Sequence, residues 1–234
     1  MDYFVDSFAK AVQMLVSFDP ELYGIIFLSL KVSISAVLIA SVIAIPLGIA
    51  ISLGKFLGKS LLISVINTFM GIPPVVVGLV VYILLSNKIG LFSSLRLLFT
   101  ATAMVIAQVL LALPIVTGLT VIAVRTVDSH IRKTAVSLGA TRLQLLLLVV
   151  REARYSIGAA IITGLGRLMA EVGAVMMVGG NIRYKTRVMT SAIALQKSMG
   201  EFQEALALGI VLLLIYFLIN VGLDYFRGAG EAAR

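Results

Sequence analysis

Two charged residues, four positions apart in an otherwise uncharged apolar stretch, are the residues best placed to act on a small ion. Arg167 and Glu171 are the charged residues of segment 155–178. Inside a bilayer an unpaired charge costs from roughly 3 to more than 10 kcal/mol, so such residues pair with one another or mark an ion pathway. Positions four apart lie on one face of a helix. We therefore predict a mutually neutralising ion pair or a translocation gate on an ion pathway, and the two roles are compatible.

The sequence lacks the side chains that most other kinds of functional site require. It contains no cysteine and a single histidine, His130, which excludes disulfides, thiolate nucleophiles and histidine metal clusters. The segment 54–60, Gly-Lys-Phe-Leu-Gly-Lys-Ser, has three residues between its glycines where a phosphate-binding loop has four. No catalytic triad signature occurs. We therefore predict no catalytic, metal or cofactor site and no ATP hydrolysis by this chain.

The composition identifies the environment in which these residues work. Hydrophobic residues make up 60% of the 234 positions and charged residues 13%, against about 45–50% and about 25% in soluble domains. A membrane-crossing helix needs about 20 mostly apolar residues, because no water satisfies its backbone polar groups. Five stretches qualify: 23–53, 61–85, 97–124, 155–178 and 205–226. The predicted fold is an all-α integral membrane protein with five transmembrane helices in one domain, 1–234.

The basic residues of the loops predict which way the chain crosses the membrane. The formal net charge of +8 is modest, and no basic face with interleaved aromatic residues indicates nucleic-acid binding. Ten Lys and Arg residues lie in the loops after spans one, three and five, against seven in the other set. Because cytoplasmic loops carry the excess, we expect the N-terminus outside and the C-terminus inside, with the cluster 183–187 as the main exception. The N-terminal segment lacks the basic region of a signal peptide, so we expect it to be retained.

The loop 125–154 has the pattern of a helix, a sharp turn and a second helix. Asp128 or Ser129 can cap the first helix, which Gly139 ends in the left-handed conformation. Its apolar residues at helical spacing are Ile131, Ala135 and Leu138. Thr141 and the glutamine three positions later form a capping box before an apolar run. Such an element suits docking to another protein, and a short basic helix could equally lie on anionic lipid.

The first helix of this loop resembles a motif of one transporter family. The sequence Lys-Thr-Ala-Val-Ser-Leu-Gly-Ala at 133–140 is similar to the EAA motif of the membrane subunits of binding-protein-dependent ABC importers. Lys133 stands where the motif has glutamate, and Thr134 stands where it has alanine. The resemblance implies a coupling helix that docks into a groove of the ATPase subunit. The implied coupling residues are Lys133, Thr134, Ala135, Leu138, Gly139 and Ala140.

Two further stretches resemble the molybdate, sulfate and tungstate permeases within that family, and the tungstate type most. They are 166–182, which contains Ala-Glu-Val-Gly-Ala and Gly-Gly-Asn-Ile, and 71–78, Gly-Ile-Pro-Pro-Val-Val-Val-Gly. The resemblance implies a homodimeric permease of the prokaryotic cytoplasmic (inner) membrane that imports an oxyanion, tungstate or molybdate. It also implies two partners: an ABC ATPase dimer, which uses ATP and magnesium, and an extracytoplasmic oxyanion-binding protein.

Small and polar residues inside the predicted spans indicate how the helices pack. Gly166, Ala170 and Ala174 recur every four positions, a stripe that lets a second helix approach closely. We predict that this stripe packs helices together, and we hypothesise that it forms the subunit interface. Asn67 and Gln108 are predicted to form interhelical hydrogen bonds rather than to bind a ligand.

Two other classes of function are compatible with the residues alone. An ATPase-independent secondary transporter or channel would use Glu171 as its proton- or cation-coupling group. Against it, the chain has a single midplane carboxylate and no visible inverted repeat. A membrane scaffold would move no substrate. Substrate flux through the purified protein in liposomes distinguishes the importer, the carrier and the scaffold. The importer needs its ATPase for flux and the carrier does not, whereas the scaffold gives no flux with any partner.

Overall fold

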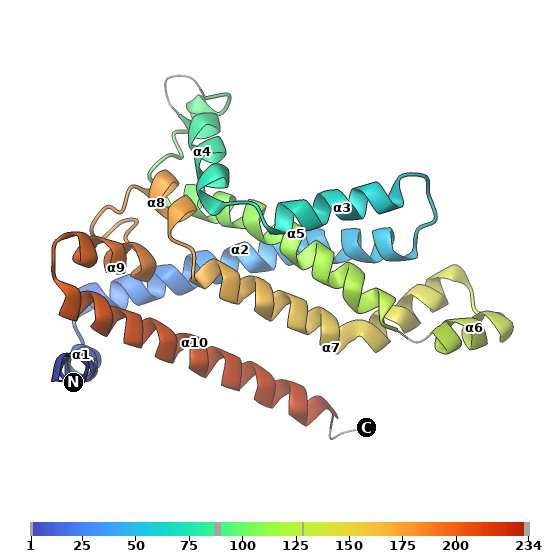
Figure 1. Ribbon diagram of the computed structural model, residues 1–234. Coiled ribbons are helices and arrows are strands. Elements are labelled where there is room, and N and C mark those ends of the chain that lie inside the picture. The colour runs from blue at the N-terminus through green and yellow to red at the C-terminus, as the bar shows by residue number, and fades with distance from the viewer. Residues whose placement is uncertain (1, 87–89, 128, 232–234) are drawn as a thin grey trace. The chain divides into compact units, whose positions relative to one another are not determined.

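The computed structural model describes residues 2–86, 90–127 and 129–231, and all regular structure within these ranges is helical (Figure 1). In chain order the elements are α1 (Asp2–Val16), α2 (Pro20–Leu53), α3 (Lys59–Met70), α4 (Pro74–Leu85), the 3₁₀ turn η1 (Ser93–Leu95), α5 (Ala101–Arg125), α6 (Ser129–Ser137), α7 (Arg142–Met169), α8 (Gly173–Gly179), α9 (Met189–Ser198) and α10 (Phe202–Glu231). The all-α prediction is confirmed. Asp128, one of the two predicted caps of α6, lies outside the described residues.

The chain divides into two compact units. The first comprises 1–36, 73–108 and 166–234, and the second comprises 37–72 and 109–165. In the first unit α1 and α9 both pack on α10, and α4 packs on α8 (Figure 1). The second unit contains α3, α6 and parts of α2, α5 and α7. The expectation of one transmembrane domain over the whole chain stays a prediction.

Each unit buries apolar side chains between its own helices. In the first unit, Leu22 of α2, Met189 of α9 and Val211 of α10 belong to one buried cluster. In the second unit, the buried cluster includes Val124 of α5 and Val149 of α7. Lipid tails are as apolar as these side chains, so within a bilayer the clusters stabilise the fold through close packing rather than through removal from water.

The membrane-spanning segments agree with the predicted number when interrupted helices are counted as one span. Within the described residues, α2, α5 and residues 202–222 of α10 are each long and apolar enough to cross a bilayer. The pairs α3 with α4 and α7 with α8 meet the same criterion only when their two helices are taken together. The second and fourth spans, predicted as single stretches, are therefore interrupted, at 71–73 and at 170–172.

A proline pair explains the first interruption. Pro73 is extended, with φ −61° and ψ 124°, and Pro74 begins α4. Proline lacks a backbone N–H and disfavours a helical conformation in the residue before it, so two in succession end one helix and can start the next. Gly71 closes α3, and its N–H donates to the carbonyl oxygen of Thr68 at 3.1 Å. Pro46, by contrast, lies inside the uninterrupted helix α2.

The N-terminal segment forms a helix, α1, that the hydropathy pattern does not predict. Ala11 is buried in a cluster with residues of α10, and Lys10 Nζ pairs with Glu204 Oε1 of α10 at 3.0 Å. The side chains of Phe8 and Val12 are exposed. A helix of this length is marginal by intrinsic propensity, so its packing on α10 supplies much of its stability.

Candidate functional site

The loop after α5 contains a helix, α6, whose end is closed by its own backbone. Gly139 has φ +80°, a conformation that residues with a Cβ atom rarely adopt. The N–H of Ala140 donates to the carbonyl of Ala135, and the N–H of Gly139 donates to that of Val136, both at 3.0 Å. This Schellman arrangement satisfies carbonyls that a helix end leaves without partners. The predicted helix and glycine turn are confirmed.

The second half of the same loop begins with a capping box. The N–H of Thr141 donates to Gln144 Oε1 at 2.8 Å, and the N–H of Gln144 donates to Thr141 Oγ1 at 3.3 Å. These bonds fix the start of α7, which then continues without a break from Arg142 to Met169. The predicted capping box is confirmed, and one uninterrupted helix follows the turn.

This helix-turn-helix element exposes apolar side chains among polar ones. Leu138 is 82% exposed and Val136 is 58% exposed, and Lys133 and Thr134 beside them are exposed as well. Ile131 is half-buried at a cavity that residues of α5 and α7 also line. Half-buried small residues of the element are Ala135 and Ala140. An exposed apolar patch next to a cation is the kind of surface that contacts another molecule, and its coupling role stays a prediction.

The predicted pairing of Arg167 with Glu171 is wrong. α7 ends at Met169, so Glu171 lies beyond the helix and the two residues do not share a helix face. Glu171 is 7% exposed, and its Oε1 accepts the N–H of Ala174 at 3.0 Å. Arg167 is exposed, and no ion pair among the described residues joins it to Glu171. A gate role for either residue stays a prediction.

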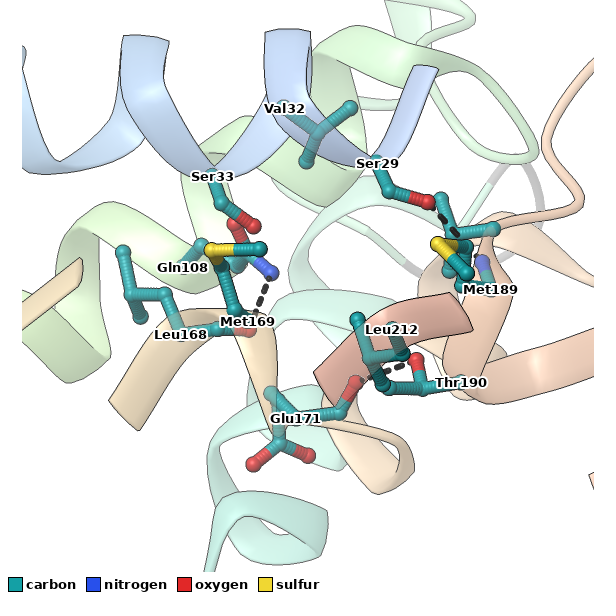
Figure 2. Close-up of a pocket in the computed structure, with 11 residues that line it drawn as sticks. Ser29, Val32, Ser33, Gln108, Leu168, Met169, Glu171, Met189, Thr190 and Leu212 are labelled. Atoms are coloured by element: carbon teal, nitrogen blue, oxygen red, sulfur yellow. Dashed lines mark hydrogen bonds between the residues drawn. The ribbon is translucent and has the colours of Figure 1, made fainter. Parts of the chain in front are cut away.

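A small cavity, lined by both polar and apolar side chains, lies beside this interruption (Figure 2). Its volume is about 10 Å³, which is room for about one water molecule. Its polar lining residues are Ser29, Ser33, Gln108, Glu171 and Thr190. Gln108 Nε2 donates to the carbonyl of Leu168 at 3.2 Å, whereas its Oε1 has no partner among the described residues. The predicted interhelical hydrogen bond of Gln108 is confirmed. The serines and Thr190 were not predicted, because isolated hydroxyl residues carry no sequence signal.

The same prediction for Asn67 is not borne out. Asn67 is exposed on α3, and no hydrogen bond joins its side chain to another described residue. The described residues also contain no group of three His, Cys, Asp or Glu side chains that could hold a metal ion.

The small residues 166, 170 and 174 do not form one stripe, because α7 ends before Ala170. Gly166 faces the ring of Tyr216 on α10, so closely that a side chain there would collide with it. Ala174 is fully buried, and a Cβ atom added at Gly78 of α4 would lie 2.7 Å from its Cα. Ala170 is exposed. The predicted close approach exists at two of the three positions, but it is made within this chain.

A second cluster of charged residues joins the start of α2 to the loop between α8 and α9. The carboxylate of Glu21 accepts hydrogen bonds from Arg183 Nε at 2.9 Å, Arg187 Nη1 at 3.3 Å and Tyr184 Oη at 3.3 Å, and also from Arg183 Nη2. The hydrogen bond and charge of Glu21 raise the pKa of the Arg183 guanidinium above its usual value. The Oδ1 of Asp19 accepts the N–H of Glu21 at 3.0 Å and so caps α2. The only indication of this cluster in the sequence is the excess of basic residues in the loop 183–187.

Comparison with known proteins identifies the class to which this architecture belongs. Residues 24–231 match the family described as the binding-protein-dependent transport system inner membrane component, so the chain belongs to that family. It is therefore an ABC transporter permease, the membrane component of such a system and not its ATPase subunit. The resemblance to ABC importer permeases is confirmed.

Individual relatives share most of the chain's length. A tungstate uptake system permease protein, TupB, of Peptoclostridium acidaminophilum is 46% identical over 220 residues, covering 94% of this chain and 96% of the relative. A probable anion ABC transporter permease protein of Haloferax volcanii is 41% identical, covering 85% of this chain and 88% of the relative. The structure of a bacterial ABC transporter that imports alginate has a TM-score of 0.74 at 17% identity, covering 92% of this chain and 81% of that one. At that identity the structural match shows a shared fold alone.

Proposed function

We propose that the chain is the permease subunit of an ABC importer that carries tungstate into the cytoplasm, with molybdate as the chemically nearest alternative. The observation that carries this proposal is the 46% identity, over nearly the full length of both chains, to a permease of a tungstate uptake system. A second tungstate uptake permease, from Campylobacter jejuni, is 34% identical over 94% of this chain. Tungstate and molybdate are both tetrahedral dianions of similar size, so one pathway suits either.

The proposed complex contains two copies of this chain, two ABC ATPase subunits and an extracytoplasmic oxyanion-binding protein. ATP and magnesium bind to the ATPase subunits, and this chain binds no cofactor. The exposed surface of α6 and its turn, centred on Leu138, is the proposed ATPase contact. Its polar neighbours Lys133 and Thr134 are exposed and available for that contact.

The orientation follows from the location of that surface. With α6 in the cytoplasm, the N-terminus lies outside, and the C-terminus lies inside. The same orientation puts the start of α2 and the loop 180–188 on the extracytoplasmic side. The ion pairs between Glu21 and Arg183 and between Glu21 and Arg187 support the placement of these two segments on one side.

The proposed mechanism is alternating access driven by the ATPase. Closure of the ATPase dimer moves α6, and the capping box makes the turn and the start of α7 one stiff connection. α7 carries that movement over its 28 residues to the interruption that contains Glu171. The loaded binding protein shifts the equilibrium between the inward-open and outward-open states only through its different affinity for each. Selectivity can therefore reside in the binding protein, while the pore binds the anion only weakly and briefly.

Reconstitution tests this proposal. The permease, the ATPase and the binding protein are placed in liposomes, and uptake of tungstate, molybdate and sulfate is measured with and without ATP. We expect ATP-dependent uptake of tungstate that competes with molybdate and is slow for sulfate. ATP-independent flux that is lost in Glu171→Gln would instead support the secondary carrier. No uptake of any oxyanion by the complete complex would reject the importer.

A further inference from the structure

The donors around Glu21 form the set that a tetrahedral oxyanion requires. Two guanidinium groups and one phenol hydroxyl donate to the two oxygens of a single carboxylate. Arginine forks match carboxylates and inorganic oxyanions equally well, because both present paired oxygens with delocalised negative charge. Glu21 therefore occupies the position that an anion from solution would take between Arg183 and Arg187.

This donor set is not fully used by the chain. The Nε of Arg187 is buried and has no hydrogen-bond partner among the described residues. The Arg187 side chain is 18% exposed and the Glu21 side chain 22%, whereas the Arg183 side chain is 59% exposed. A buried donor without a partner is costly, and an anion with four oxygens offers more acceptors than the two of a carboxylate. The cluster thus has capacity for a larger anion than the one it holds.

Residues of the cluster line two clefts. A cleft of about 610 Å³ has Lys10, Arg183 and Arg187 among its lining residues, together with the carboxylates Asp19, Glu21 and Glu204. A smaller cleft of about 170 Å³ is lined in part by Glu21, Tyr184, Lys185 and Arg187. Both clefts exceed the volume of a single tetrahedral oxyanion. Lys10 lines the same large cleft as Glu21 and is paired there with Glu204.

We propose that Arg183, Tyr184 and Arg187 form a reception site for a tetrahedral oxyanion, which Glu21 occupies until the anion replaces it. The carboxylate keeps the two arginines neutralised while the site is empty, and a dianion outcompetes it when the binding protein raises the local anion concentration. Because Glu21 lies in the first turn of α2 and the arginines belong to the loop before α9, the exchange also breaks the ion pairs between α2 and that loop. The identity of the anion and the extracytoplasmic position of the site rest on the proposed function.

The direct test is to remove the Glu21 carboxylate, which competes with the anion for the two arginines. The permease–ATPase complex in nanodiscs, without the binding protein, is dialysed against tungstate, and bound tungsten is measured by elemental mass spectrometry. Glu21→Gln removes the competing charge, and we expect it to bind tungstate about tenfold more tightly than wild type. Arg187→Lys in the Glu21→Gln background keeps the charge but removes the fork, and we expect it to abolish that gain. Lys197→Gln, which removes an exposed cation of α9 that no ion pair among the described residues uses, should leave the gain intact.

Two outcomes overturn the proposal while leaving the importer in place. Equal tungstate binding by wild type and Glu21→Gln, with normal tungstate uptake by the wild-type complex, leaves the cluster as a structural ion pair only. If the double variant Glu21→Gln with Arg187→Lys keeps the gain in tungstate binding, the anion binds elsewhere. If Glu21→Gln does not fold, Arg187→Lys alone is used as the test variant. Uptake is then measured against the concentration of tungstate-loaded binding protein. The proposal requires that the concentration giving half-maximal uptake rises several-fold while the maximal rate stays unchanged.

Absence of uptake by wild type together with a gain in tungstate binding by Glu21→Gln would reject the proposed function and not the site.

Discussion

The hydroxyl of Thr190 donates a hydrogen bond to the main-chain carbonyl of Glu171, 2.8 Å away and nineteen positions earlier in the chain. Both residues are buried. The carbonyl belongs to the interruption between α7 and α8, where the backbone no longer repeats the helical hydrogen bonds, so it needs a partner from elsewhere. The first turn of α9 supplies that partner. No proline stands between α7 and α8, and this tertiary contact helps to hold the interruption.

Thr190→Val should destabilise the protein, because it keeps the shape of the side chain and removes the hydroxyl. The carbonyl of Glu171 would then be buried without its donor, at a cost of about 1–3 kcal/mol. Unfolding of the purified permease in detergent, followed by circular dichroism against temperature, measures the change. ATP-driven uptake should fall as well, since the candidate gate loses its support.

Thr163→Val is the matched control for that variant. The hydroxyl of Thr163 donates to the carbonyl of Ala159 within α7 at 2.9 Å, and the residue is exposed. That carbonyl is also part of the helical repeat, so the loss of the hydroxyl should change stability by no more than about 0.5 kcal/mol. Equal melting temperatures for the two valine variants would contradict a supporting role of the Thr190 contact.

The difference between these two threonines also explains what the sequence could predict. The turn at Gly139 and the capping box at Thr141 involve residues within five positions of each other, so residue types alone predict them. The interruption at Glu171 depends on Thr190, and the cluster at Glu21 depends on residues more than 160 positions away. Such contacts are set by how distant segments pack. A helix pattern alone therefore extends α7 through Glu171 and pairs that residue with Arg167, which the structure does not do.

Arg167→Ala tests the corrected assignment of that arginine. An ion pair with a buried Glu171 would make its removal cost several kcal/mol, whereas an exposed arginine without that pair should cost no more than about 0.5 kcal/mol. We therefore expect the variant to fold and to melt at the wild-type temperature, so transport can be measured directly. A normal fold with reduced oxyanion uptake would support a pathway role, and a marked loss of stability would show that Arg167 has a partner in the assembled complex.

Gly139→Val should weaken attachment of the ATPase without preventing insertion of the permease. The position has φ +80°, and a Cβ atom there would meet no atom within 4 Å, so the backbone conformation is the main obstacle. A β-branched residue is a strong outlier at positive φ, so we expect the Schellman turn to rearrange. The measurement is the amount of ATPase that copurifies with the permease in mild detergent, together with ATP-driven uptake.

Gly139→Asn separates the backbone conformation from the loss of glycine itself. Asparagine adopts positive φ far more readily than valine, so this variant should retain most of the ATPase and most of the uptake. Comparable recovery of the ATPase with valine and with asparagine would mean that the left-handed turn is not needed for docking.

Gly78→Ala should destabilise the contact between α4 and α8. The added Cβ would lie 2.7 Å from the Cα of Ala174, a backbone atom that cannot rotate away, so the two helices must separate. Overpacking of this kind costs about 1–3 kcal/mol, which exceeds the gain of up to about 1 kcal/mol that alanine brings to a helix in place of glycine. Gly209→Ala in α10 is the matched control, because its Cβ would meet nothing within 4 Å and should leave stability unchanged or improved. If both variants melt at the wild-type temperature or above, a Cβ atom fits at Gly78. The close approach of α4 and α8 at Gly78 and Ala174 would then not depend on glycine at that position.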